Sequence, residues 1–261
     1  MRRRPAALLA VAGVALSACG TTTTGTPATS TGGTDSRAGA ITVFAAASLK
    51  ETFTTLGHMY EAAHPGARVT FDFGASSTLA TQITQGAPAD VFAAASQATM
   101  QTVTSAGDAV GTPRVFAVNT LEIATPTSPT TRVTSLADLA RPAVKVAICQ
   151  VSVPCGAAAR TLFDRSHLAV TPVSEEVDVK SVLTKVELGE VDAGLVYVTD
   201  VRSAQGRVVG VAIPKDQNVT TTYPIAAISG RGQAATAQAF VDLVLSPAGQ
   251  SVLTAAGFSS P

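Results

Sequence analysis

Apolar strands alternate with amphipathic helices from residue 41 to the end of this 261-residue chain, and no other feature limits the fold as strongly. Short runs rich in Val, Ile, Phe and Ala mark the strands, and apolar residues that recur every three or four positions mark the helices. The first pair is the strand Ile41–Ala46 and the helix Leu49–Ala63. Further strands are expected at 68–74, 90–94, 115–126, 145–149, 192–200, 207–213 and 221–228, and further helices at 77–85, 97–106, 156–166, 180–188, 234–245 and 249–256. Strands joined by helices predict an α/β fold of largely parallel sheets with helices on both faces.

Two of these strands are long enough to run through more than one domain. The apolar runs at 115–126 and 221–228 are each expected to cross between two lobes. The expected lobes are residues 41–120 together with 226–261, and residues 121–225, both of ordinary domain size.

The charges of the chain balance, because 18 Lys and Arg residues match 18 Asp and Glu residues and give a formal net charge of zero. This balance provides no basic surface for nucleic acid and no long-range field toward a charged partner. A small anion would have to be bound by local dipoles instead. Hydrophobic residues make up 46% of the chain and charged residues 14%, as expected for a large buried core.

The N-terminus has the pattern of a targeting segment, a signal peptide expected at residues 1–18. Arg2–Arg4 precede an apolar run at 6–16, which is shorter than the roughly 20 residues that span a bilayer. The run ends in LSAC, which resembles the lipobox of bacterial lipoproteins, in which the cysteine, here Cys19, carries the lipid. Residues 19–40 are therefore expected to be an acylated cysteine and a flexible Thr/Gly/Ser tether. The expected location is the outer face of the cell membrane, with export and lipid anchoring; an ordinary signal peptide that contains a cysteine is the alternative.

Two cysteines, Cys149 and Cys155, remain after Cys19. Outside the reducing cytoplasm, this pair can form a disulfide, which would stabilise the fold by roughly 2 kcal/mol on the chain-entropy argument. Two free, buried cysteines are the alternative. The histidines have no ligand spacing with either cysteine, so no direct metal site is expected.

Four junctions between strands and helices carry small or capping residues at positions where a ligand would lie. Parallel α/β sheets bind ligands beyond the carboxyl ends of their strands, where helix N-termini offer unpaired N–H groups and a partial positive charge. Ser48 follows the first strand, and the sequence SLKE at 48–51 matches a capping box. The other junctions contain Ser76 and Ser77, Pro154 to Gly156, and Asp178, which is expected to cap a helix. Helix capping alone remains an alternative explanation for such residues.

Several of these segments together resemble the molybdate-binding proteins of bacterial ABC importers. The segments are VFAAASLKETF, FGASSTLATQITQGAPADVF, VPCGAAAR, DVKSVL, GLVYVTD and YPIAAI, in this order from about residue 41 to 258. The resemblance implies a two-lobed type II periplasmic-binding-protein fold of mixed, mostly parallel sheets, with the ligand in the cleft between the lobes. It also implies a binding protein that is not an enzyme and has no cofactor.

The resemblance implies five ligand-binding residues. Ser48 and Ser76 would supply hydroxyl and backbone donors from the first lobe. From the second lobe, Cys155 and Val179 would each supply a backbone N–H, and Tyr197 would supply its phenolic hydroxyl. The family often has alanine where Cys155 stands, and a disulfide at this position would be able to tilt the N–H.

The implied function is the capture of molybdate, and of the similar tungstate, by a monomer that delivers it to the membrane permease subunits of an ABC importer. Two alternatives stay open, namely a receptor for another tetrahedral oxyanion such as sulfate or phosphate, and an exported enzyme. No G-x-S-x-G, S-x-x-K or H-E-x-x-H motif supports the enzyme. Among nearby charged residues, Asp90 is expected to be a structural cap, and Lys50 and Lys180 are expected to face solvent.

Overall fold

The computed structural model describes residues 37–261. The predicted signal peptide, the acylated Cys19 and the tether up to residue 36 lie outside the described residues. The strands are β1 (Ala40–Ala46), β2 (Arg68–Gly74), β3 (Val91–Ala93), β4 (Arg114–Pro126), β5 (Val146–Cys149), β6 (Ser174–Glu176), β7 (Ala193–Tyr197), β8 (Val208–Ala212) and β9 (Thr220–Ala227). The α-helices are α1 (Lys50–Ala63), α2 (Ser76–Thr84), α3 (Gln97–Ser105), α4 (Pro154–Arg165), α5 (Val179–Glu187), α6 (Val198–Ser203), α7 (Ala234–Leu245) and α8 (Pro247–Ala256), and the 3-10 helices are η1 (Ala47–Leu49) and η2 (Leu136–Ala140).

These elements follow the order that the hydrophobic pattern predicts, with two differences, namely the additional short strand β6 and the end of β7. The pattern predicts a strand over 192–200, but β7 ends at Tyr197 and the short helix α6 begins at Val198. The cause is Asp200, whose carboxylate accepts a hydrogen bond of 3.1 Å from the Tyr197 backbone N–H. This bond satisfies the Tyr197 N–H at the start of α6, so the strand ends there.

The nine described strands form one mixed sheet in the order β2-β1-β3-β9-β4-β7-β5-β6, with β8 beside β4. β1 is parallel to β2 and β3, and β5 is parallel to β6 and β7. The antiparallel pairings all involve β4 or β9. The parallel strands therefore form two groups, and the two long strands join them.

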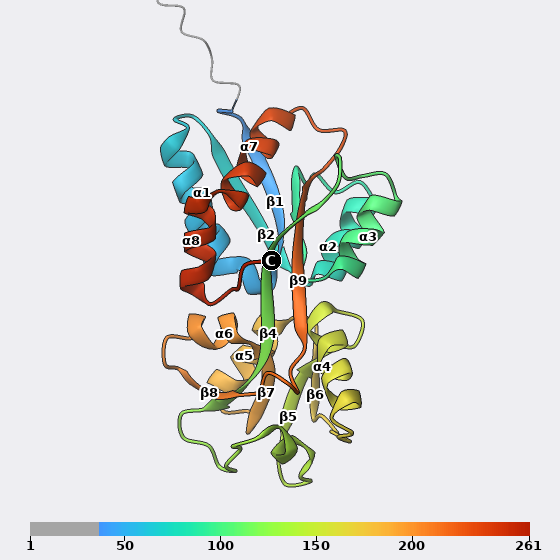
Figure 1. The fold of residues 1–261 in the computed structure, drawn as a ribbon, viewed down its shortest axis with the longest axis vertical. Coiled ribbons are helices and arrows are strands. Elements are labelled where there is room, and N and C mark those ends of the chain that lie inside the picture. The colour runs from blue at the N-terminus through green and yellow to red at the C-terminus, as the bar shows by residue number, and fades with distance from the viewer. Residues whose placement is uncertain (1–36) are drawn as a thin grey trace, which may run out of the picture. The chain divides into compact units, whose positions relative to one another are not determined.

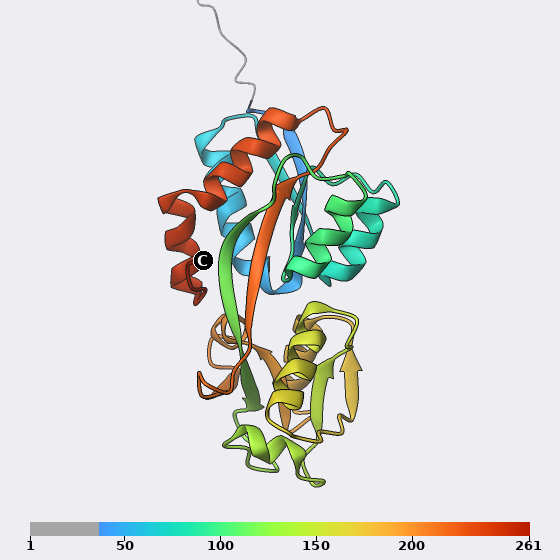
Figure 2. The same ribbon diagram turned by 45° about the vertical axis from the view of Figure 1, so that its right-hand side comes forward.

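β4 and β9 run side by side between these two groups (Figure 1 and Figure 2). Residues 114–120 of β4 pair with β9, and residues 121–126 of the same strand pair with β7 and β8. We call β1, β2, β3 and β9 with residues 114–120 the first sheet half, and β5 to β8 with residues 121–126 the second sheet half. The two strands that connect the halves are the long apolar runs that the sequence suggests as crossings.

Helices cover both faces of each sheet half (Figure 1). In the first half, α1, α7 and α8 pack on one face, where Val43 and Phe53 are buried. Helices α2 and α3 pack on the other face, around Phe44 and Phe92. Val43 and Phe44 are neighbours in β1 but belong to different cores, because side chains alternate between the two faces of a strand. The core of the second half lies between its strands and the helices α4 and α5.

The two C-terminal helices belong to the core of the first sheet half. Phe240 of α7 and Leu253 of α8 are buried with Phe53 of α1. Within residues 37–261, no single helix has the length and hydropathy of a membrane span; α7 and α8 meet those criteria only when taken together, and they are bent by 59° at their junction.

The connections that matter for function are those in which a strand leads directly into a helix. β1 leads into η1 and α1, β2 into α2, β5 into α4, and β6 into α5. Two of these helix starts belong to each sheet half. All four start beyond the carboxyl end of a parallel strand, where ligands of such sheets bind.

Candidate anion-binding site

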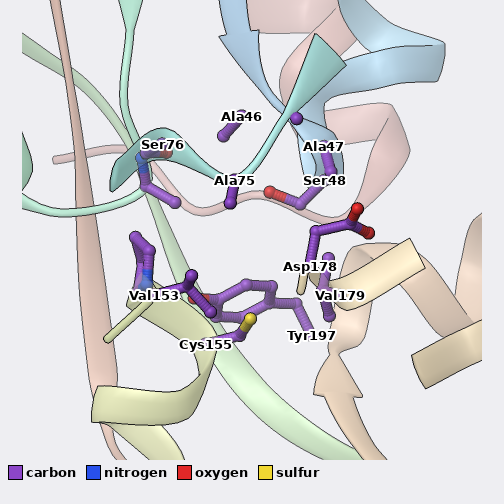
Figure 3. A pocket seen from close by; sticks show the side chains of 13 residues that line it. Ala46, Ala47, Ser48, Ala75, Ser76, Val153, Cys155, Asp178, Val179 and Tyr197 are labelled. Atoms are coloured by element: carbon purple, nitrogen blue, oxygen red, sulfur yellow. The ribbon is translucent and has the colours of Figure 1, made fainter. Parts of the chain in front are cut away.

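A small cavity lies where the four helix starts meet, between the two sheet halves (Figure 3). The first half contributes Ser48 and Ser76, and the second contributes Cys155, Val179 and Tyr197. The other lining residues are Ala46, Ala47, Gly74, Ala75, Ala95, Val153, Pro154 and Asp178. The structure therefore brings the five candidate residues from the sequence to one place.

The cavity has the size of one small polyatomic ion. Its volume, counted as the space that the centre of a water molecule can occupy, is ≈ 20 Å³. A sphere of this volume, enlarged by the water radius of ~1.4 Å, has a radius of about 3 Å. A tetrahedral oxyanion fits such a space.

Helix starts at the cavity carry backbone N–H groups that have no acceptor inside their own helix. The first helical hydrogen bond of α2 runs from Leu79 N–H to Ala75 O. That of α4 runs from Ala157 N–H to Val153 O. The N–H groups before these positions can therefore bind a ligand, and each helix adds about half a positive charge at its N-terminus. Together these groups favour an anion.

Ser48 lies buried in η1 at the edge of the cavity. The sequence predicts a capping box of Ser48 and Glu51, and this prediction is wrong, because α1 has no side-chain cap. Ser48 Oγ is 2.9 Å from Tyr223 Oη, while the Glu51 carboxylate binds Lys180. The physical reason is η1, which extends the helix backwards through Ser48 and so removes the serine from the cap position. In Figure 3 the Ser48 oxygen is directed toward the space beside Ala75.

Ser76 is the first residue of α2 and is 1% exposed. Its Oγ accepts a hydrogen bond of 3.0 Å from the Ala95 backbone N–H, which follows β3. Because this bond uses the oxygen as an acceptor, the hydroxyl hydrogen is available to donate to a ligand. Ser76 is therefore a positioned donor at the cavity and not a helix cap; the cap position of α2 is Ala75.

Tyr197 ends β7 and places a buried hydroxyl at the cavity. This hydroxyl makes no hydrogen bond of regular geometry with the described residues, although Thr221 and Tyr223 lie close enough to affect its pKa. A buried polar group without a partner costs about 1–3 kcal/mol, which a ligand that accepts a hydrogen bond would recover. Burial raises the pKa of Tyr197 well above its usual value, and nearby Tyr223 and Asp200 raise it further. The hydroxyl therefore keeps its proton and acts as a donor.

Cys155 lies in the first turn of α4 and is joined by a disulfide to Cys149 at the end of β5. Their Cα atoms are 5.7 Å apart. Gly156 follows, and a Cβ atom there would lie 1.9 Å from the backbone oxygen of Gln150. The disulfide and this close approach together hold the start of α4 against the end of β5. They fix the position of the Cys155 N–H at the cavity.

Val179 opens α5, whose N-terminus is capped by Asp178 as the sequence predicts. Asp178 Oδ1 accepts a hydrogen bond of 3.0 Å from Ser181 N–H. The first helical bond runs from Val182 N–H to Asp178 O. The N–H groups of Val179 and Lys180 therefore have no acceptor within the helix.

Lys180 does not face solvent as the sequence position suggests, because its side chain is only 20% exposed. Its Nζ lies 2.9 and 3.0 Å from the two carboxylate oxygens of Glu51, 3.2 Å from Asp200 Oδ1 and 2.8 Å from Ser203 Oγ. Glu51 belongs to α1 beside the first sheet half, and the other two residues belong to α6 beside the second. The ammonium group therefore bridges the halves. The expectation that Lys180 faces solvent was wrong because the position of a residue in a helix does not show which other helices pack against it.

Asp200 is the fully buried carboxylate of this network, with an exposed fraction of 0%. Burial raises its pKa to about 6, while the neighbouring charge of Lys180 opposes the rise. Its second oxygen accepts the hydrogen bond from Tyr197 N–H. Asp200 thus connects the bridging ammonium to a residue of the cavity.

The cavity is lined without a lysine or arginine side chain in the part of the chain that the structure describes. Lys50 is exposed, as expected. Asp90 has a structural contact, since its carboxylate accepts a hydrogen bond of 2.8 Å from Thr42 N–H. Over residues 37–261, no cluster of His, Cys, Asp and Glu side chains is arranged to hold a metal ion. Binding at this site would therefore rest on neutral donors and helix dipoles.

Sequence reasoning missed the residues behind the cavity. Tyr223 contacts Ser48, Ala95 N–H contacts Ser76, and Asp200 holds Tyr197. The available signal for Tyr223 was a tyrosine inside the apolar run YPIAAI, a buried position where a hydroxyl needs a partner. A backbone N–H such as that of Ala95 leaves no signal in the sequence.

Comparison with known proteins gives a consistent picture. The profile of a bacterial extracellular solute-binding protein family matches residues 41–259. The molybdate-binding protein ModA of Mycobacterium tuberculosis is 45% identical over 246 residues, which cover 94% of this chain and 93% of that protein. ModA of Escherichia coli is 31% identical over 85% of this chain and 89% of that protein. The periplasmic molybdate-binding protein of Azotobacter vinelandii has the same fold, with a TM-score of 0.76 and 20% identity over 85% of this chain and 99% of that chain.

Proposed function

Because the chain belongs to the bacterial extracellular solute-binding proteins, and among them to the family of molybdate-binding proteins, we propose that it captures molybdate outside the cytoplasm for an ABC importer. The members of this family bind solutes and are not enzymes. Tungstate, which has the same tetrahedral shape and charge, is proposed as a second ligand.

The observation that carries this proposal is the convergence of four helix starts on one cavity of oxyanion size, in whose lining residues 37–261 place no cationic side chain. Transfer of an unpaired ion out of water costs on the order of tens of kcal/mol. Hydrogen bonds to a charged acceptor return about 1.5–3 kcal/mol each, so several donors are needed. The N–H groups and hydroxyls at the cavity supply such donors, and the helix N-termini add to them.

We assign the ligand to Ser48, Ser76, Cys155, Val179 and Tyr197. The serine and tyrosine hydroxyls would donate with their side chains, and Cys155 and Val179 with their backbone N–H groups. The same arrangement bears on the alternative ligands. Phosphate keeps a proton near neutral pH and requires an acceptor, whereas the five assigned residues would all act as donors to the ligand. Sulfate carries no proton but is smaller than molybdate, and it would contact fewer of the donors at once.

Delivery requires that the loaded protein differs from the empty one. We propose that residues 41–120 with 226–261, and residues 121–225, are two lobes that close on the anion by bending of β4 and β9. Ligand contacts from both sheet halves would shift such an equilibrium toward the closed form. The permease of the importer would then recognise the closed monomer.

The proposed lipid anchor places the protein where an importer can use it. The family consists of extracellular proteins, and the lipobox-like LSAC at 16–19 supports acylation of Cys19 after removal of residues 1–18. In cells, Cys19→Ser should release the protein from the membrane fraction. Retention of the variant at the membrane would contradict lipid anchoring without affecting the proposed ligand.

Calorimetric titration of the purified protein with molybdate, tungstate, sulfate and phosphate tests the function. We expect tight one-to-one binding of the first two anions and much weaker binding of the others. A preference for sulfate or phosphate would leave the anion site standing and refute the choice of ligand. No binding of any of the four would refute the site.

Variants at the two serines test the assignment of the cavity. Ser48→Ala and Ser76→Ala should each weaken molybdate binding by about tenfold or more, which is the loss of one hydrogen bond to a charged acceptor. Ser246→Ala is the matched control, because Ser246 caps α8 and does not line the cavity. Normal binding by both cavity variants would show that the anion lies elsewhere.

A further inference from the structure

The hydroxyl of Ser48 has a protein partner outside the cavity. Ser48 Oγ lies 2.9 Å from Tyr223 Oη, and either hydroxyl can be the donor in this pair. Both side chains are buried, Ser48 with 5% and Tyr223 with 0% exposure. Tyr223 itself does not line the cavity. It comes from β9, one of the two strands that connect the sheet halves.

The ring of Tyr223 is held from several sides, so its hydroxyl has little freedom to turn away. Its centroid lies 5.3 Å from that of Phe258, 6.1 Å from Tyr197 and 6.3 Å from Phe116, all in edge-to-face contacts. Burial raises the pKa of Tyr223 far above its usual value, and the hydrogen bond with Ser48 opposes this rise. The phenol therefore keeps its proton over the whole physiological range.

Counting protons decides which way this bond runs when an anion is bound. A serine hydroxyl has one hydrogen, and an oxyanion without a proton can only accept hydrogen bonds. Ser48 can donate its hydrogen to the anion only if its bond with Tyr223 uses the tyrosine hydrogen. At Ser76 the direction of the corresponding bond is fixed, because the partner of its oxygen outside the cavity is Ala95 N–H, which can only donate.

We propose that Tyr223 is a positioning residue for anion binding, which donates to Ser48 Oγ and so directs the single hydrogen of Ser48 into the cavity. This inference rests on the proposed function, because it concerns the same site. The role of Tyr223 is indirect: without the phenol, the oxygen of Ser48 would lose the donor that holds its hydroxyl in this orientation.

The test is a double-mutant cycle with Tyr223→Phe and Ser48→Ala, with molybdate affinity measured by calorimetry. Tyr223→Phe keeps the ring and its packing and removes only the hydroxyl. We expect this variant to bind about fivefold to tenfold more weakly than the parent, and to cause less than a twofold further loss when Ser48 is already alanine. Tyr60→Phe is the matched control, since Tyr60 is also buried and its hydroxyl bonds to Arg37 O and Thr236 O, away from the cavity.

The outcomes separate this inference from the function on which it rests. A parent protein that binds none of the anions refutes the proposed function. A parent that binds molybdate, with Tyr223→Phe binding equally well, refutes only the role of Tyr223. An equal loss from Tyr223→Phe in the parent and in the Ser48→Ala background would also refute it, because the effect would then be a general change of packing.

Discussion

Replacing Lys180 by methionine removes the ammonium group that bridges the sheet halves and keeps most of the length of the side chain. Two carboxylates lose their partner. Glu51 is 51% exposed, so water and salt already screen its charge, and its share of the loss is about 0–1 kcal/mol. Asp200 is fully buried, so it dominates the outcome.

The magnitude follows from the pKa of Asp200, which is about 6 in the folded parent, above the roughly 3.9 of an unfolded chain. A carboxyl group with a raised folded pKa destabilises the fold when it is charged. This penalty grows as the pH rises from about 4 through the folded pKa, and it is absent below that window. Without Lys180 the folded pKa rises further and the window extends upward. At pH 7.5 the added penalty from Asp200 is limited to about 2 kcal/mol, because each pH unit above the parent pKa contributes about 1.4 kcal/mol. Near pH 5 it almost vanishes.

Urea denaturation of the parent and of Lys180→Met at pH 5 and pH 7.5 measures this difference. We expect a loss of about 2–3 kcal/mol in the free energy of unfolding at pH 7.5, and of less than about 1 kcal/mol at pH 5. Adding Asp200→Asn to the variant should restore most of the stability at pH 7.5, because the amide has no charge to neutralise. An equal loss at both pH values, or a double variant no more stable than Lys180→Met, would refute the assignment of the loss to Asp200.

Three further changes test the bridge and the start of α4. Glu51→Gln weakens the contact between the sheet halves by about 0.2–1 kcal/mol. The rate of molybdate release, measured by stopped flow, should therefore become up to about fivefold faster at low salt, and this rate should no longer depend on salt. A release rate equal to that of the parent at low salt would contradict this role of Glu51. Gly156→Ala should cost about 1–3 kcal/mol in urea denaturation and also weaken molybdate binding, since the new Cβ meets Gln150 O; Gly232→Ala, where a Cβ has open space, should do neither. Reduction of the Cys149–Cys155 disulfide should lower the free energy of unfolding by roughly 2 kcal/mol, measured by urea denaturation with and without reductant, and an unchanged midpoint would contradict it.

The order of most elements and the helix starts that line the cavity can be predicted from the sequence because both depend on local patterns, whereas Tyr197 is singled out only by the family resemblance. Alternating strands and helices follow from hydrophobic spacing, and α2, α4 and α5, which carry Ser76, Cys155 and Val179 in their first turns, each follow a strand. The segment after β7 is different. Its apolar run continues past Tyr197, and the helix begins there because the Asp200 carboxylate, three residues further on, accepts a hydrogen bond from Tyr197 N–H.

The network behind the site escapes sequence reasoning because it joins residues that are far apart in the chain. Ser48 meets Tyr223 across 175 positions, and Lys180 meets Glu51 across 129. A local motif, the capping box, offered a simpler partner for Ser48 and Glu51. The capping box does not form, because the tertiary fold gives both side chains other partners: the buried phenol of Tyr223 for the Ser48 hydroxyl, and the ammonium group of Lys180 for the Glu51 carboxylate.

The way in which β4 and β9 connect the sheet halves also sets an order of folding. The second sheet half is built from one continuous stretch of chain, residues 121–212. The first half is built from segments that are far apart in the chain, since Val91 of β3 pairs with Ala227 of β9. Closing so long a loop is slow compared with local pairing, so the second half is expected to form first. The cavity, which draws on both halves, is then completed in the last step. Molybdate would therefore slow unfolding and leave the rate of refolding unchanged.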